Sequence, residues 1–326
     1  SRRFENLFGA PRDPKTSEGI DPYYADVAAS IQAVTEEVLL AMVKDLQRVT
    51  GQRRLCLAGG VALNSVANGR ILRETPIEEL FIHPAPGDSG GAIGAALYAH
   101  HVYLGQPRRF VMDHAAWGKG YTGAEVLEWL DRTSVQHRVA AGEGELLDRV
   151  VDALVRGKVV GWVQGRFEWG PRALGHRSIL ADPRRAVMKD LVNRKIKFRE
   201  PFRPFAPSVV AERAEELFDL PNAKDVYPAR FMQLVVPVRD EARDRIPATT
   251  HVDGSGRLQA VHRETNPLYY QLIERFAQAT GVPVLLNTSF NLKGEPIVAS
   301  PADAINTFHR SGIDLLVLGD CLIEKG

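Results

Sequence analysis

Leu55-Cys56-Leu57-Ala58 (residues 55–58) is a short apolar run that leads directly into the glycine pair Gly59-Gly60. An apolar run of this length that ends at glycines is typical of a buried strand followed by a tight turn. Residues 22–50 before it and residues 66–73 after it have the composition of helices. The order helix, strand, glycine turn, helix indicates an α/β fold.

The helix predicted over residues 22–50 has apolar side chains at steps of three or four. This spacing places them on one face of a helix, and we expect that face to be buried. The residues concerned are Val27, Ile31, Val34, Val38, Met42 and Leu46.

A second strand is predicted over residues 80–83, and it runs into a loop that contains Gly87-Asp88-Ser89-Gly90-Gly91. An Ala- and Gly-rich helix that reaches about residue 103 follows this loop. The same unit of strand, glycine turn and helix is therefore used twice, which favours two parallel strands of one sheet.

The 326 residues predict about two domains, and we place the boundary after residue 112. The first domain is then 1–112 and the second 113–326, joined by a segment rich in Gly, His and charge. The second domain is also predicted to be α/β. Its predicted strands are 159–163, 231–238, 258–262, 282–286 and 315–318, and its predicted helices are 185–196, 211–218, 267–279 and 301–310.

The composition narrows the function classes. The chain is 44% hydrophobic and 25% charged with a net charge of +1, so no global field favours nucleic acid or an anionic membrane. Its apolar stretches are shorter than the roughly 20 residues of a membrane-spanning helix. Two cysteines suit a reducing compartment, and we expect a cytoplasmic location. The start Ser1-Arg2-Arg3 lacks Met, so we expect the chain to be part of a longer protein.

Both glycine loops have two interpretations. Paired glycines such as Gly59 and Gly60 let a backbone approach a ligand, and the next helix offers its amides to phosphate, but glycines also permit tight packing. Asp88 could bind a ligand at the strand end or cap the next helix. Two such loops after parallel strands favour a shared nucleotide or metal site.

Residues 161–204 are the most basic part of the chain, with eleven basic and four acidic residues. The segment therefore has a formal net charge of +7, and the rest of the chain has a net charge of −6. Within it, the run 168–178, Glu-Trp-Gly-Pro-Arg-Ala-Leu-Gly-His-Arg-Ser, interleaves arginines with small or rigid residues. Such a loop favours presentation of guanidinium groups to a compact dianion such as phosphate. A nucleic-acid surface is the rival interpretation, and it needs a broader basic surface with exposed aromatics.

Short polar side chains also follow the strand predicted over residues 282–286. The run 287–291, Asn-Thr-Ser-Phe-Asn, can surround a small polar ligand or build a turn without one. The turn 251–257, His-Val-Asp-Gly-Ser-Gly-Arg, is ambiguous in the same way.

Together these strings resemble the O-carbamoyltransferases of nodulation-factor and antibiotic biosynthesis. The resemblance covers essentially the whole chain and rests on residues 58–64, 86–96, 168–183, 192–210, 251–261 and 284–298. It implies the second half of an actin-hexokinase-like (ASKHA) domain followed by a YrdC-like domain. It also implies that carbamoyl phosphate and ATP give carbamoyladenylate and pyrophosphate, and that the carbamoyl group then passes to a substrate hydroxyl with the help of a divalent metal ion.

The resemblance assigns site residues by motif. It implies that the catalytic residues of the carbamoyl phosphate site are Arg172, Lys197, Arg257 and Ser289. It implies that Arg166, Asn287 and Asn291 bind substrate, that Gly59, Gly60, Asn64 and Gly87 bind the nucleotide, and that Asp88 binds the metal. Cations aimed at a departing phosphate lower the barrier, and Asn and Ser can hold the carbamoyl end. The family's His-x-x-x-His metal pair is absent from this sequence, so the metal site implied here is incomplete.

The resulting prediction is the C-terminal part of an ATP-dependent O-carbamoyltransferase. The expected partners are carbamoyl phosphate and a small hydroxyl-bearing acceptor, with no nucleic acid and no membrane, and a homodimer is left open. Two alternatives stay open as well. One is a threonylcarbamoyladenylate-type synthase, which would depend on bicarbonate and threonine. The other is a non-catalytic nucleotide- or anion-binding fragment.

Overall fold

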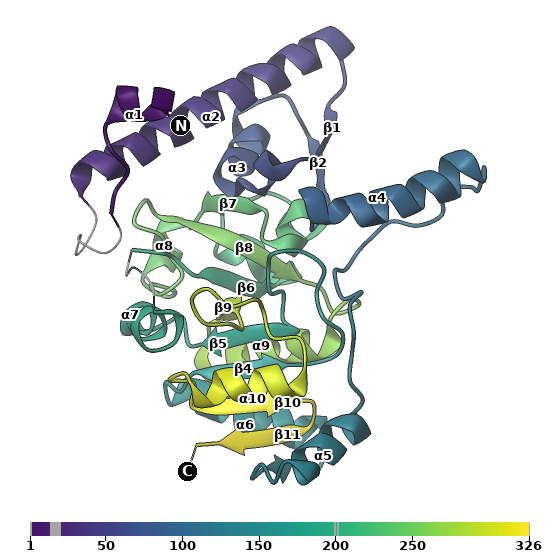
Figure 1. The fold of residues 1–326 in the computed structure, drawn as a ribbon, viewed down its shortest axis with the longest axis vertical. Helices are drawn as coiled ribbons and strands as arrows, with labels where there is room; N and C mark the ends of the chain where they lie inside the picture. The colour runs from purple at the N-terminus through teal and green to yellow at the C-terminus, as the bar shows by residue number, and fades with distance from the viewer. Residues whose placement is uncertain (1, 14–20, 199, 201, 326) are drawn as a thin grey trace.

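The computed structural model describes residues 2–13, 21–198, 200 and 202–325. Figure 1 shows a stack of strands and helices with α2 across one end and α4 extending sideways from the body. No helix among the described residues combines the length and apolarity needed to cross a membrane. The prediction of an α/β fold is confirmed.

The first unit is built around a two-stranded parallel sheet. Strands β1 (Arg54–Leu57) and β2 (Glu79–Ile82) pair in parallel, as the repeated strand and turn predicted. The helices of this unit are α1 (Arg2–Phe8), α2 (Pro22–Thr50), α3 (Ser65–Glu74) and α4 (Gly91–Tyr98), and a π-helical turn, Ala99–Tyr103, continues α4.

The second unit is a nine-stranded mixed sheet in the order β3-β11-β10-β4-β5-β9-β6-β8-β7. The pairs β10–β4 and β6–β8 are parallel and the others antiparallel. Its strands are β3 (Arg138–Val139), β4 (Val160–Val163), β5 (Arg177–Ala181), β6 (Ala206–Val210), β7 (Leu234–Pro237), β8 (Ser255–Val261), β9 (Val284–Ser289), β10 (Leu315–Leu318) and β11 (Cys321–Glu324).

Helices cover both faces of the large sheet, because alternate strand residues point to opposite sides. Leu180 and Val317 belong to a core with α6 and α9, whereas Ile179 and Leu316 belong to a core with α5, α7 and α10. The helices are α5 (Gly123–Arg132), α6 (Glu143–Val155), α7 (Val187–Val192), α8 (Asp240–Arg243), α9 (Pro267–Thr280) and α10 (Pro301–His309).

Two predicted helices of the second unit are shorter or tighter than expected. The helix predicted over 185–196 divides into α7 and a π-helical turn, Asn193–Lys197. The helix predicted over 211–218 is a 3₁₀ helix, Ala211–Glu216. Strands β5 and β6 were not predicted, although each is fully buried.

The two units share one hydrophobic core. Leu40 of α2 and Ile71 of α3 belong to the same buried cluster as Phe218 and Leu234 of the second unit. Helix α3 lies so close to β7 that a Cβ on Gly69 would stand 2.0 Å from the carbonyl oxygen of Val235. The first unit is therefore fixed to the edge of the large sheet.

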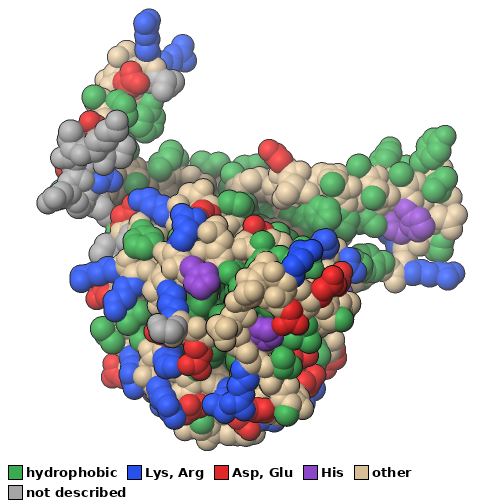
Figure 2. Space-filling view, turned by 60° about the horizontal axis from the view of Figure 1, so that its bottom comes forward, with side chains coloured by type: hydrophobic (Ala, Val, Ile, Leu, Met, Phe, Trp, Pro, Cys, Tyr) green, Lys and Arg blue, Asp and Glu red, His purple; other side chains and the backbone are tan. Residues whose placement is uncertain are grey.

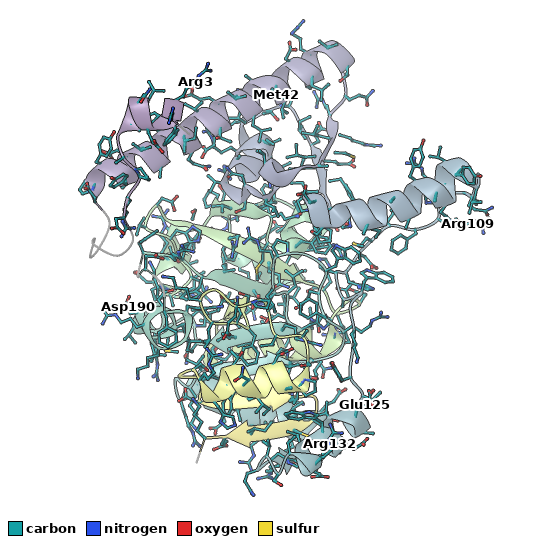
Figure 3. The ribbon with its side chains drawn as sticks, viewed as in Figure 1. Arg3, Met42, Arg109, Glu125, Arg132 and Asp190 are labelled. Carbon is teal, nitrogen blue, oxygen red and sulfur yellow. The ribbon has the colours of Figure 1, made fainter. Side chains whose placement is uncertain are left out.

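The predicted buried face of α2 is wrong. Ile31, Val34, Val38, Met42 and Leu46 are exposed, while Leu39, Leu40 and Val43 pack against the rest of the chain. Apolar side chains occupy more than one side of this helix, and α3 covers only one of them. Figure 2 shows hydrophobic side chains along the helices beyond the rounded body, and Figure 3 labels Met42 on α2.

This assignment predicts a difference between two neighbouring truncations in α2. Leu40→Ala should lower the free energy of unfolding by about 2–4 kcal/mol, because it leaves a cavity against α3. Met42→Ala should change it by less than about 0.5 kcal/mol, because Met42 is 64% exposed. Urea unfolding followed by circular dichroism measures both. Equal losses for the two variants would contradict the assigned face.

Candidate functional site

The arginine loop, residues 164–176, connects the antiparallel neighbours β4 and β5. Two of its glycines have positive φ and no room for a side chain. A Cβ on Gly170 would lie 2.6 Å from the carbonyl oxygen of Pro84, and one on Gly175 would lie 2.3 Å from the ring of Tyr269. The loop is thus fixed in its middle against the first unit and near its C-terminal end against α9.

The anion pocket, a hollow of about 450 Å³, lies between this loop, the start of α3 and the large sheet. Four residues predicted for the carbamoyl phosphate site or for substrate binding line it together, namely Arg172, Arg257, Asn287 and Ser289. They come from the arginine loop, β8 and β9, which are far apart in the sequence. Further polar lining comes from Ser65, Arg203, His251 and Thr288.

Arg172 is a half-buried cation without an ion pair among the described residues. Burial lowers the pKa of its guanidinium group, and no neighbouring charge counteracts this shift. Its Nε has no hydrogen-bond partner among those residues and no contact with solvent. A guanidinium group that is shielded from water and has no paired carboxylate is stabilised when an anion enters the pocket.

Lys197 lies directly behind Ser289. Its Nζ donates to Ser289 Oγ at 3.2 Å, to the Asn291 carbonyl oxygen at 3.1 Å and to Asn291 Oδ1 at 2.8 Å. Lys197 is 5% exposed, so this ammonium group is enclosed in the protein. It therefore orients the Ser289 side chain and adds positive charge to this wall of the anion pocket.

Two predicted substrate-binding residues do not line the anion pocket. Arg166 donates to the carbonyl oxygens of Trp117 and Gly118, both at 2.8 Å, on the exposed side of the arginine loop. Asn291 donates to the carbonyl oxygen of Glu295 at 2.7 Å and accepts from Lys197. Backbone carbonyl oxygens thus accept hydrogen bonds from Nε and Nη2 of Arg166 and from Nδ2 of Asn291.

Asn287 lines the pocket and also supports the arginine loop. Its Nδ2 donates to the carbonyl oxygen of Ala173 at 3.2 Å and to Ser208 Oγ and Gln259 Oε1, both at 3.0 Å. The side chain is fully buried, and its Oδ1 has no partner among the described residues. Asn287 therefore has a free acceptor but no free donor.

The predictions missed three polar residues that the structure brings to the anion pocket. The first is Arg203, one of the eleven basic residues of 161–204, for which the sequence predicted no site role. It pairs with Glu200 at 2.8 Å. Ser65 and Val66 place the N-terminus of α3 at the pocket, where backbone amides favour an anion. The third is His251, from the glycine-rich turn before β8. The fold alone reveals these neighbours, because each lies far along the chain from Arg172.

His251 is uncharged at neutral pH. Burial lowers the pKa of its imidazole to about 4, and the charges of Arg257 and Lys189 contribute to this shift. Its Nδ1 lies 3.1 Å from Ser255 Oγ, which donates its own proton to Asp253 Oδ1 at 2.6 Å. Because Ser255 Oγ already donates, Nδ1 carries the imidazole proton and Nε2 carries the lone pair.

The interface hollow, of about 540 Å³, lies between the first unit and the outer side of the arginine loop. The loop after β2 lines it and contacts the loop after β1, since Gly59 N donates to the Pro86 carbonyl oxygen at 2.8 Å and a Cβ on Gly87 would lie 3.8 Å from Gly60 Cα. Gly87 and Asp88 line this hollow, and Pro171 lines both it and the anion pocket. The two glycine loops are thus neighbours, and the shared nucleotide or metal site stays a prediction.

Asn64 has a structural role in the first unit. Its Oδ1 caps α3 by accepting from Ala67 N at 3.2 Å, and its Nδ2 donates to Gln32 Oε1 of α2 at 3.0 Å. The amide group that was assigned to the nucleotide is thus bonded within the protein.

The residues around Asp88 do not form a metal site by themselves. In the part of the chain that the structure describes, no three His, Cys, Asp or Glu side chains gather closely enough to hold a metal ion. A single carboxylate is a poor ligand set for a divalent metal. No step of the reaction is therefore assigned to a metal here.

The sequence of this chain matches known protein families and known proteins. The family described as "Carbamoyltransferase C-terminus" matches residues 151–325, and "Carbamoyltransferase N-terminus" matches residues 1–97. The nodulation protein NolNO of Sinorhizobium fredii is 44% identical over 93% of this chain, and the match covers 44% of NolNO. The 3'-hydroxymethylcephem-O-carbamoyltransferase of Amycolatopsis lactamdurans is 37% identical over 83% of this chain, which covers 49% of that enzyme.

An uncharacterized protein of Synechocystis is 45% identical over 100% of this chain, which covers 56% of that protein. The chain thus spans about half the length of the relatives it matches. Among solved structures, full-length HypF in its phosphate- and nucleotide-bound form aligns with a TM-score of 0.36 and 16% identity, over 58% of this chain and 22% of HypF.

These matches define the family of this chain. The chain belongs to the carbamoyltransferase family, and the predicted resemblance to O-carbamoyltransferases is confirmed.

The neutral state of His251 predicts a pH dependence of stability. The unfolded chain binds a proton at His251 near pH 6.5, whereas the folded chain binds it only near pH 4, so stability falls as the pH drops through this interval. His251→Asn removes the titration and keeps a donor for Ser255. It should reduce the loss of stability between pH 7 and pH 4 by roughly 1–3 kcal/mol.

Urea unfolding of both proteins at pH 4 and pH 7 measures this difference. The variant should still lose some stability between pH 7 and pH 4, because burial also lowers the pKa values of His83, His176 and His262. An equal loss of unfolding free energy between pH 7 and pH 4 in the two proteins would contradict a neutral His251 in the folded chain.

Proposed function

We propose that this chain is the carbamoyl phosphate-binding part of an ATP-dependent O-carbamoyltransferase. One observation carries the proposal, namely that the half-buried Arg172 lines a pocket that has no carboxylate among its described lining residues. Arg257, Arg203 and the N-terminus of α3 surround the same space, and Lys197 lies behind Ser289. This set supplies a dianionic phosphate with several donors and almost no competing negative charge.

The chemistry of carbamoyl phosphate fits the two ends of the pocket. Cleavage of its mixed anhydride by water releases inorganic phosphate, whose developing charge Arg172 and Arg257 are placed to stabilise. The carbamoyl amide offers N–H donors, and Asn287 Oδ1 and His251 Nε2 are acceptors without a partner among the described residues. The neutral imidazole of His251 suits this role, because a protonated ring would repel the neighbouring arginines.

The proposed second step uses ATP. A carbamate oxygen attacks the α-phosphorus of ATP, the bond to the β-phosphate oxygen breaks, and carbamoyladenylate and pyrophosphate result. The carbamoyl carbon is then transferred to a hydroxyl acceptor as AMP departs. We assign the nucleotide to the interface hollow, which Gly87 and Asp88 line. This assignment rests on the family resemblance and on the contacts of Gly59 with Pro86 and of Gly60 with Gly87.

We also propose the domain assignment implied by the resemblance. Residues 1–112 correspond to the second half of an ASKHA-like domain and residues 113–326 to a YrdC-like domain. The separate sheets of the two units support this division. The same proposal includes a cytoplasmic location and a small hydroxyl-bearing acceptor. It also includes a divalent metal ion, with Asp88 as one of its ligands.

Removal of the unpaired guanidinium group should abolish donor binding. Arg172→Ala deletes the guanidinium group that donates hydrogen bonds to the phosphate. We therefore expect the affinity for carbamoyl phosphate to fall at least 30-fold, which corresponds to a loss of about 2 kcal/mol of binding free energy. Calorimetric titration with carbamoyl phosphate measures this, with inorganic phosphate as the competing ligand. Arg166→Ala is the matched control, since Arg166 bonds carbonyl oxygens outside the pocket. Unaltered binding in Arg172→Ala would refute the assignment of the loop.

Asp88 should be separable from donor binding. It lines the interface hollow and not the anion pocket, so Asp88→Ala should leave carbamoyl phosphate affinity within twofold of the unaltered chain. The same calorimetric titration measures this. A loss of donor binding as large as that of Arg172→Ala would show that the two hollows do not divide the ligands as proposed.

Two other functions give different results in the same assays. Pyrophosphate release that depends on bicarbonate and threonine identifies a threonylcarbamoyladenylate-type synthase. Binding of ATP and carbamoyl phosphate without pyrophosphate release identifies a binding module.

A further inference from the structure

One buried carboxylate organises the backbone of the arginine loop. Glu168 is 2% exposed, and its Oε1 accepts hydrogen bonds from three backbone amides of the same loop and of the strand that follows. The donors are Leu174 N at 2.9 Å, His176 N at 2.7 Å and Arg177 N at 3.1 Å. These amides have no place in a helix, so the carboxylate provides the partner that burial requires.

The carbonyl side of the same segment is held by other buried side chains. Gln259 Nε2 donates to the Leu174 carbonyl oxygen at 2.8 Å, and Trp162 Nε1 donates to the Gly175 carbonyl oxygen at 2.9 Å. Asn287 holds the carbonyl oxygen of Ala173. The backbone that directly follows Arg172 is therefore fixed from both sides by neighbouring parts of the fold.

Arg172 depends on this backbone for its position. Its side chain has no ion pair among the described residues, and its Nε has no hydrogen-bond partner among them. No side-chain contact of that kind holds the guanidinium group in place before a ligand enters. Its direction into the anion pocket is set by the path of the loop, which Glu168 determines at residues 174, 176 and 177.

We propose that Glu168 is a positioning residue, whose buried carboxylate holds the arginine loop so that Arg172 is ready to receive the phosphate of the carbamoyl donor. The inference rests on the proposed function of the anion pocket. Charge-assisted hydrogen bonds to three amides are stronger than those to a neutral oxygen, so the negative charge itself matters for the loop.

The sign of one mutational effect separates this role from simple electrostatics. Glu168 is negative and repels an anion in the neighbouring pocket, so loss of this Coulomb repulsion alone would strengthen anion binding. Loss of the loop geometry would weaken it. Glu168→Gln removes the charge with little change of shape, so the two explanations predict opposite changes of affinity.

The first test is calorimetric titration of the full chain with carbamoyl phosphate. Glu168→Gln should bind at least tenfold more weakly than the unaltered chain. Glu36→Gln is the matched control, because Glu36 is a buried carboxylate of α2 that pairs with Arg70 at 2.6 Å, away from the pocket. It should lower the thermal midpoint without changing the affinity. Affinity equal to or higher than normal in folded Glu168→Gln would overturn the inference.

A double-mutant cycle tests whether Glu168 acts through Arg172. Arg172→Lys keeps a cation but loses the fork, and Glu168→Gln should cause a smaller loss in this background than in the unaltered chain. Fully additive losses would contradict a positioning role. Where Glu168→Gln does not fold, Glu168→Asp retains the charge with a shorter reach and should show an intermediate loss, and normal affinity there would overturn the inference.

The outcomes also separate this inference from the proposed function. Absence of carbamoyl phosphate binding by the folded, unaltered chain would overturn both. Normal binding that is lost in Arg172→Ala but retained in Glu168→Gln would overturn only the role of Glu168.

Discussion

A guanidinium group that leaves water without meeting a carboxylate loses hydration and gains no Coulomb attraction in return. Arg172 is in this position, and the protein keeps it there by enclosing its loop in a network of buried hydrogen bonds. Such an arrangement costs stability in the ligand-free chain. It becomes favourable when a compact anion enters, because a preorganised donor needs no rearrangement at that moment. In the proposed function, the anion pocket is therefore built around a cation whose partner is the ligand.

The remaining fold places other groups around this cation. The close approach of Gly69 to Val235 fixes α3 against β7, and this contact brings the N-terminus of α3 to the pocket. The approach of Gly170 to Pro84 fixes the other side of the arginine loop against the first unit. Because both contacts join the two units, the glycine loops of the first unit and the arginines of the second become neighbours. Pro171 lines both the anion pocket and the interface hollow, so it lies where the two hollows adjoin.

Much of this arrangement could be predicted from the sequence. Glycine turns at the ends of apolar runs correctly indicated β1 and β2, and the motifs indicated that Arg172, Arg257 and Ser289 share a site, which the pocket lining is consistent with. Arg166 and Asn291 show why the rest could not be predicted. A motif gives the residue type, but the nearest carbonyl oxygen decides where the side chain points. In α2, the apolar spacing indicated a buried face, but the position of α3 decides which apolar side chains are covered. The role of Glu168 could not be predicted, because nothing in the sequence shows that three amides six to nine residues away converge on it.

The most direct test of the central claim is a crystal structure of this chain soaked with carbamoyl phosphate at saturating concentration. The account predicts that the phosphate group lies in the anion pocket, with its oxygens accepting hydrogen bonds from Arg172 and Arg257 and with Ser289 within hydrogen-bond distance. It also predicts that the backbone of residues 173–177 keeps its bonds to Glu168. Carbamoyl phosphate bound in another hollow, with the anion pocket containing only solvent, would contradict the account.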